Sequence, residues 1–146
     1  MRLDLLVEDE RWCAALAMPP LRFARRALKA ACEAEACDAA VSVLMADDAR
    51  LRALNKSFRG KDSATNVLAF PAPAGAVLGD IALAYETVAG EAVAQGKPFP
   101  AHAAHLLVHG FLHLLGYDHV EARAAARMEA RERVILEYLG WPDPYA

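Results

Sequence analysis

One apolar segment of the chain carries all five of its histidines, which fall between His102 and His119. The last three are spaced H-x3-H-x5-H. Residues four apart in a helix lie one turn apart on the same face, so a helix here stacks His109 on His113. Gly116 then allows the helix to end in a left-handed turn that brings the chain back toward the same point. The spacing therefore predicts a helix followed by a tight return.

Three imidazoles at one point are typical of a metal site. Three protein ligands with one open position indicate a catalytic zinc rather than a closed structural one. We predict that His109, His113 and His119 hold one Zn²⁺ per chain, although three imidazoles also suit nickel, copper or iron. His105 lies one turn before His109, so these two form a competing pair. We disfavour that pair because a turn at Gly116 would bring His119 toward His113.

Several polar residues near this segment have open roles. His105 either orients a ligand or faces the substrate, or it is a core histidine with a satisfied hydrogen bond. Asp118 directly precedes His119 and is a candidate to orient an imidazole through its N–H. Asp80, Asp118 and Glu121 are candidates for proton transfer, and no pattern selects one of them.

The remaining chain alternates strand-like and helix-like segments. The order βαβαββααα predicts an α+β fold, with a small mixed sheet covered by helices and the metal site at the end of a central histidine-bearing helix. Phe58, Phe70 and Phe99 are expected in the core. Strands are expected over residues 3–7, 39–45, 65–70 and 79–85, a turn over 71–75, and helices over 21–35, 48–58, 87–95, 101–115 and 120–139.

Composition limits the classes of protein that fit. A length of 146 residues suits one domain, 1–146, with one core. The net charge of −3 argues against a generally basic nucleic-acid binder. Residues 1–61 carry 11 Lys and Arg against 9 Asp and Glu, whereas 62–146 carry 5 against 10, so an anionic partner should contact the first half. With no signal segment and no long apolar run, we expect a cytoplasmic protein without membrane contact and with reduced cysteines.

The spacing H-x3-H-x2-G-x2-H is also that of metzincin proteases. Those enzymes place a glutamate directly after the first histidine, as the general base that activates water. Here that position is Gly110, which cannot accept a proton. A protease therefore remains only a weak alternative.

The histidine segment and a second block together resemble one known family. The sequence HGFLHLLGYDH over 109–119 is very close to the signature of the YbeY family of bacterial rRNA maturation factors, which are metal-dependent endoribonucleases. Residues 54–71 are similar to the family's LN-x2-FR-x2-D-x2-TDVLSFP block, residues 79–81 to its GDI strand start, and residues 139–145 to its C-terminal ending. The resemblance runs from about residue 50 to the end.

The resemblance implies an α+β fold, zinc ligation by the three histidines, and an arginine important for activity at Arg59. It implies a single-strand-specific, zinc-dependent endoribonuclease in 16S rRNA 3′-end maturation and ribosome quality control. The implied partners are ribosomal RNA, the small subunit or the 70S ribosome with its proteins, and an assembly GTPase. Asn66 and Ala69 depart from the family's usual Asp and Ser. We interpret Asn66 as structural because it lies at a strand start.

Arg59 has a chemical rationale as well. Phosphodiester cleavage builds negative charge on oxygen, and a guanidinium donates to two oxygens at once. Arg59 ends a basic helix, so Lys56 and Lys61 are weaker candidates for contacting an RNA backbone. The alternative is a salt bridge from Arg59 to Asp62 or Asp80. A second function also remains open: a ribosome-assembly factor that mainly binds, with a mostly structural zinc.

Overall fold

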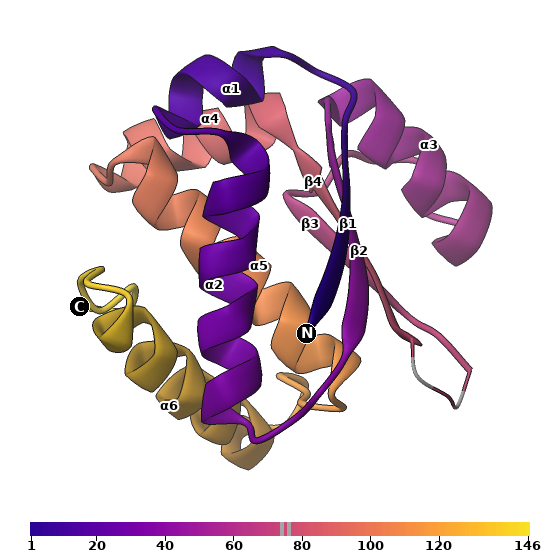
Figure 1. Cartoon of the computed structure of the whole chain (residues 1–146). Helices are drawn as coiled ribbons and strands as arrows, with labels where there is room; N and C mark the ends of the chain where they lie inside the picture. The colour runs from indigo at the N-terminus through magenta and orange to yellow at the C-terminus, as the bar shows by residue number, and fades with distance from the viewer. Residues whose placement is uncertain (74, 76) are drawn as a thin grey trace.

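The computed structural model describes residues 1–73, 75 and 77–146. A four-stranded sheet in the order β1-β2-β4-β3 runs through the described residues (Figure 1). β1 pairs with β2 and β2 with β4 in parallel, whereas β3 and β4 are antiparallel, so the sheet is mixed as expected. The strands are β1 (Arg2–Val7), β2 (Ala40–Ala46), β3 (Val67–Pro71) and β4 (Val77–Ala84).

Helices cover both faces of the sheet. Figure 1 shows α3 on one face and α2, α5 and α6 on the other. Among the described residues, no helix combines the length and the apolar character that crossing a bilayer requires. The helices are α1 (Arg11–Leu16), α2 (Pro20–Ala34), α3 (Asp48–Arg59), α4 (Tyr85–Gln95), α5 (Phe99–Leu114) and α6 (Ala122–Tyr138).

The central helix is α5, which is buried over most of its surface. Its apolar side chains Leu107, Phe111 and Leu112 are fully buried in the main core. Gly110 lets the helix lie close to the sheet, because a Cβ there would stand 3.0 Å from Cγ2 of Ile81. A larger residue at 110 would have to displace the sheet side chain. The close packing fixes the direction in which the polar stripe of α5 points.

The predicted α+β fold is confirmed, but the sequence reading missed one helix. The order in the structure is βααβαββααα, and the additional helix is α1. It carries Trp12, which is fully buried and donates from its indole Nε1 to the carbonyl of Ala46 at 2.9 Å. The helix begins beside Asp9, whose carboxylate accepts from the backbone N–H of Arg11 at 3.0 Å. At six residues it is too short to show a clear helical period.

Other boundaries and one core assignment also differ. β3 includes Pro71, which an edge strand tolerates because one side of its backbone needs no partner. β4 begins at Val77, and the expected turn over 71–75 includes residue 74, which lies outside the described residues. The placement of Phe58 in the core was wrong. Its side chain is 69% exposed and packs against Phe70, with ring centroids 5.4 Å apart.

Candidate metal centre

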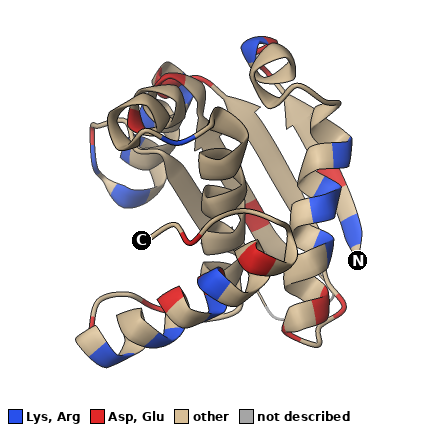
Figure 2. Cartoon of the chain, turned by 90° about the vertical axis from the view of Figure 1, so that its left-hand side faces the viewer, with Lys and Arg blue, Asp and Glu red and all other residues tan. Residues whose placement is uncertain are grey.

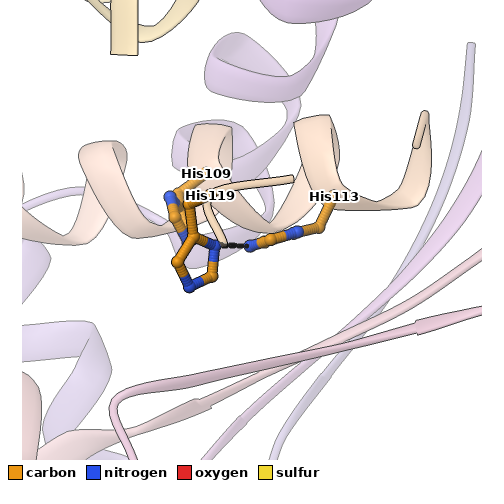
Figure 3. A group of neighbouring side chains, drawn as sticks. All are labelled: His109, His113 and His119. Atoms are coloured by element: carbon orange, nitrogen blue, oxygen red, sulfur yellow. Dashed lines mark hydrogen bonds between the residues drawn. The ribbon is translucent and has the colours of Figure 1, made fainter. Parts of the chain in front are cut away.

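Three histidine side chains converge at the C-terminal end of α5 (Figure 3). His109 and His113 come from successive turns of the helix, and His119 from the loop that follows it. Nε2 of His113 lies 3.1 Å from Nε2 of His109 and 3.0 Å from Nδ1 of His119. Ligand atoms about 2.0–2.1 Å from a tetrahedral zinc stand roughly 3.3–3.4 Å apart. Two of the three pairs of nitrogens are therefore already near the spacing that one ion requires, and all three nitrogens lie within 4.8 Å of one another.

The turn after α5 places His119. Gly116 has a φ of 100°, and the N–H of Tyr117 returns to the carbonyl of Leu112 at 3.0 Å. Asp118 then accepts from the backbone N–H groups of His119 at 2.6 Å and of Val120 at 3.1 Å. Asp118 thus shapes the loop through the backbone, whereas the sequence had suggested a contact with an imidazole.

The hydrogen bonds of two of these histidines determine which ring nitrogen faces the point where the three converge. Nδ1 of His113 lies 3.0 Å from the carbonyl of Tyr117, which only accepts, so Nδ1 carries the proton and the lone pair of Nε2 points inward. Nδ1 of His109 lies 3.3 Å from a carboxylate oxygen of Glu132, with the same consequence. Burial lowers the pKa of His113, and the neighbouring histidines lower it further. Two neutral lone pairs facing each other suit a cation between them, so this donor set fits a metal.

Glu132 on α6 was missed by the sequence reading. It is fully buried and accepts from Nδ1 of His109, from Nε2 of His105 at 2.6 Å, and from the hydroxyl of Tyr145 at 2.8 Å. Burial opposes its ionisation, but the hydrogen bonds from the two histidines outweigh it and lower the pKa of Glu132 to about 2. The sequence did contain an indication of this role. Glu132 lies at helical spacing between the apolar residues Met128 and Ile135, on the buried face of α6.

His105 is therefore linked to the metal centre through Glu132. Nε2 of His105 is hydrogen-bonded to Glu132, which also contacts the candidate ligand His109, whereas Nδ1 of His105 is buried without a hydrogen-bond partner among the described residues. His105 does not line the cleft described next, so the structure gives no support to a substrate-facing role.

A cleft of about 650 Å³ opens beside the three histidines. Arg59 lines the same cleft and donates from a terminal guanidinium nitrogen to the carbonyl of Ala69 at 2.9 Å. The expected alternative, a salt bridge from Arg59 to Asp62, is wrong, because Asp62 instead pairs with Arg52 at 2.6 Å. Within the described part of the chain, no carboxylate forms an ion pair with Arg59.

The other candidate residues divide between the cleft and the remaining surface. Lys61 and Asp118 line the cleft, whereas Lys56 is exposed on α3 outside it. Asp80 lines a different cavity, on the α3 side of the sheet, and Glu121 is exposed where α6 begins. On the side of the molecule shown in Figure 2, Lys and Arg are interspersed with Asp and Glu. Basic residues are thus not confined to one part of the ribbon in that view.

Asn66 lines the cleft and connects β3 to α4 directly, and to α5 through Glu91. Its Oδ1 accepts from the N–H of Val67 at 2.7 Å, and its Nδ2 donates to Glu91 on α4 at 3.0 Å. Glu91 also accepts from Nε2 of the buried His102 on α5, at 2.9 Å. The amide of Asn66 thus supplies a donor that a carboxylate would not.

We expect Asn66→Asp to lower stability at neutral pH by about 1–3 kcal/mol, since it removes the donor and sets two carboxylates against each other. Two carboxylates in contact repel each other only when both are ionised, so the deficit is full at neutral pH and shrinks in mild acid. Urea unfolding of both proteins at neutral and mildly acidic pH measures this. A deficit that does not change with pH would contradict the contact.

Comparison with known proteins places this site in a family. The family model described as Endoribonuclease YbeY matches residues 17–140. A Rhodopseudomonas palustris protein named Endoribonuclease YbeY is 48% identical over 154 residues, covering 98% of this chain and 80% of the relative. One of the same name from Azorhizobium caulinodans is 47% identical, covering 100% and 97%. A solution structure of a Thermotoga maritima protein matches with a TM-score of 0.68 and 28% identity, covering 92% of this chain and 87% of that one.

Proposed function

Because the chain belongs to the YbeY family of endoribonucleases, we propose that it is a zinc-dependent hydrolase that cleaves single-stranded RNA. The observation that carries the proposal is the convergence of three imidazole nitrogens in a cleft that Arg59 also lines. A zinc held by His109, His113 and His119 would supply Lewis-acid chemistry and lower the pKa of a water molecule.

The chain's own residues prepare the cleft for a phosphodiester. The carbonyl of Ala69 holds one guanidinium nitrogen of Arg59, which leaves its other N–H groups to donate to phosphoryl oxygens. Lys61 adds a second positive charge to the lining of the cleft. The N–H of His109 is held by Glu132, and that of His113 by a carbonyl, so both rings keep their orientation while the substrate binds.

The position of Gly110 argues against a peptidase. In the proteases with this histidine spacing, the residue after the first ligand is a glutamate that acts as general base. Gly110 occupies that position. A side chain added there would meet Ile81 and Val67 of the sheet. No carboxylate can act from there.

The proposed substrate is ribosomal RNA, with maturation of the 16S rRNA 3′ end and ribosome quality control as the cellular roles. An unpaired strand can bend into a concave site and splay its bases, whereas an A-form duplex is rigid. The proposed partners are the small subunit or the 70S ribosome with its proteins, together with an assembly GTPase, in the cytoplasm. These assignments are supported by the family relationship.

The test is cleavage by the purified, nuclease-free protein of a 16S rRNA precursor fragment that extends beyond the mature 3′ end. A matched duplex of the same sequence serves as the control, and the zinc content of the protein is measured in parallel. We expect cleavage of the single strand and about one zinc per chain. Bound zinc without cleavage, either alone or with assembled ribosomes, would support the binding-factor alternative instead.

A further inference from the structure

The metal centre is joined to the C-terminal residues by one buried carboxylate. Glu132 has no exposed surface, and its two oxygens accept from three donors that come from α5 and from the C-terminal segment. An ionised carboxylate buried without partners is costly, so a position like this persists only where donors satisfy it. The three donors are His105, His109 and Tyr145.

The C-terminal segment is fixed where it meets Glu132. Lys97 donates to the carbonyl of Pro144 at 2.7 Å, and Arg133 pairs with Asp143 at 3.1 Å. These contacts hold the hydroxyl of Tyr145 at 2.8 and 2.9 Å from the two oxygens of Glu132. Burial raises the pKa of Tyr145, and the carboxylate raises it further, so the hydroxyl stays protonated and donates.

The cluster of His105, His109 and Glu132 has the composition of a second metal site. Its spacing indicates hydrogen bonding instead. Nε2 of His105 lies 2.6 Å from the carboxylate, at the short limit of a charge-assisted hydrogen bond, whereas two ligands of one zinc stand roughly 3.3 Å apart. A proton, and not an ion, therefore fits between these atoms.

His109 belongs to both clusters, so its hydrogen bond to Glu132 affects how it faces the other two histidines. A carboxylate only accepts, so the ring nitrogen that faces Glu132, Nδ1, must carry the hydrogen. Nε2 is then left with its lone pair toward His113 and His119. A hydrogen bond to a carboxylate also makes the ring a stronger donor to a metal.

We infer that Glu132 is a positioning residue that sets the tautomer and orientation of His109 and thereby the affinity of the centre for zinc. The inference rests on the proposed zinc-dependent function. It assigns to α6 and the C-terminal segment a role in metal binding, although neither provides a ligand.

The test is the zinc affinity of Glu132→Gln, measured by competition with a chromophoric chelator. The amide places an N–H group where the carboxylate accepts, so one imidazole must lose its hydrogen bond or change tautomer. We expect the affinity to fall on the order of 10–100-fold. Glu137→Gln makes the same chemical change at an exposed position of α6 and should bind zinc like the wild type. Wild-type affinity in Glu132→Gln would overturn the inference.

A second measurement separates positioning from folding. Circular dichroism and thermal unfolding of the metal-free variants show whether Glu132→Gln is folded. If it is not, proton–nitrogen correlations of the zinc-loaded, nitrogen-labelled wild type decide the question. We expect His109 to bind zinc through Nε2 and to keep a slowly exchanging hydrogen on Nδ1. Ligation through Nδ1 would overturn the inference.

The outcomes distinguish this inference from the proposed function. If the wild type takes up no zinc, both fail together. If the wild type binds zinc and cleaves RNA, and Glu132→Gln has unchanged affinity, only the role of Glu132 fails. If Glu132→Gln binds zinc weakly but cleaves normally once saturated, the carboxylate acts on affinity, as inferred.

Discussion

Replacement of His113 by alanine is expected to abolish zinc binding and RNA cleavage together. His113 is the middle ligand, since its Nε2 lies 3.1 Å from the ligand atom of His109 and 3.0 Å from that of His119. Without it, two imidazoles remain, and zinc retained after dialysis should fall from about one ion per chain to less than about a tenth of that. Metal analysis and an RNA cleavage assay on the same preparation measure both effects.

A matched control for this variant lies on the same helix. His102 is not one of the three converging histidines, and His102→Gln keeps a donor for Glu91. This variant should therefore retain both zinc and cleavage. If metal-free His113→Ala cleaved RNA at the wild-type rate, the three histidines would not be the catalytic centre.

Replacement of Arg59 by lysine is expected to reduce cleavage by about 10²–10³-fold while zinc content stays unchanged. Lysine keeps the positive charge but loses the planar set of donors that can bind the carbonyl of Ala69 and two phosphoryl oxygens at once. The two variants therefore separate metal binding from charge stabilisation. Single-turnover cleavage with saturating protein measures the loss.

Arg50→Lys is the control for this second prediction. Arg50 lies on the same helix, pairs with Glu8 at 3.4 Å, and lines the cavity on the other side of the sheet. It should cleave like the wild type. Equal losses in both variants would indicate an effect that does not depend on the position of the arginine, and an unaffected Arg59→Lys would remove Arg59 from the mechanism.

The convergence of the three histidines could be predicted because it is local. Two histidines one turn apart, followed by a glycine turn, place His109, His113 and His119 together through backbone geometry alone. Glu132 and Tyr145 reach the centre only because α6 and the C-terminal segment pack beside α5. Contacts of that kind depend on tertiary structure, which local spacing does not encode.

The remaining errors have similar causes. The partner of Arg59 is a backbone carbonyl, and every residue offers one, so residue identity could not reveal it. Phe58 was assigned to the core by its hydrophobicity, yet its side chain is largely exposed and contacts Phe70 at the edge of a surface cavity. Helix α1 is held by burial of Trp12 between distant segments, and its short sequence carries too little periodicity to predict it.

Removal and return of the metal in the unmodified protein test the central claim most directly. The purified, nuclease-free wild type is treated with a chelator, dialysed, and assayed on single-stranded RNA before and after addition of zinc. We expect cleavage to disappear with the metal and to return at about one equivalent of zinc per chain. Cleavage that persists at the original rate in the metal-free protein would contradict a metal-dependent ribonuclease built on these three histidines.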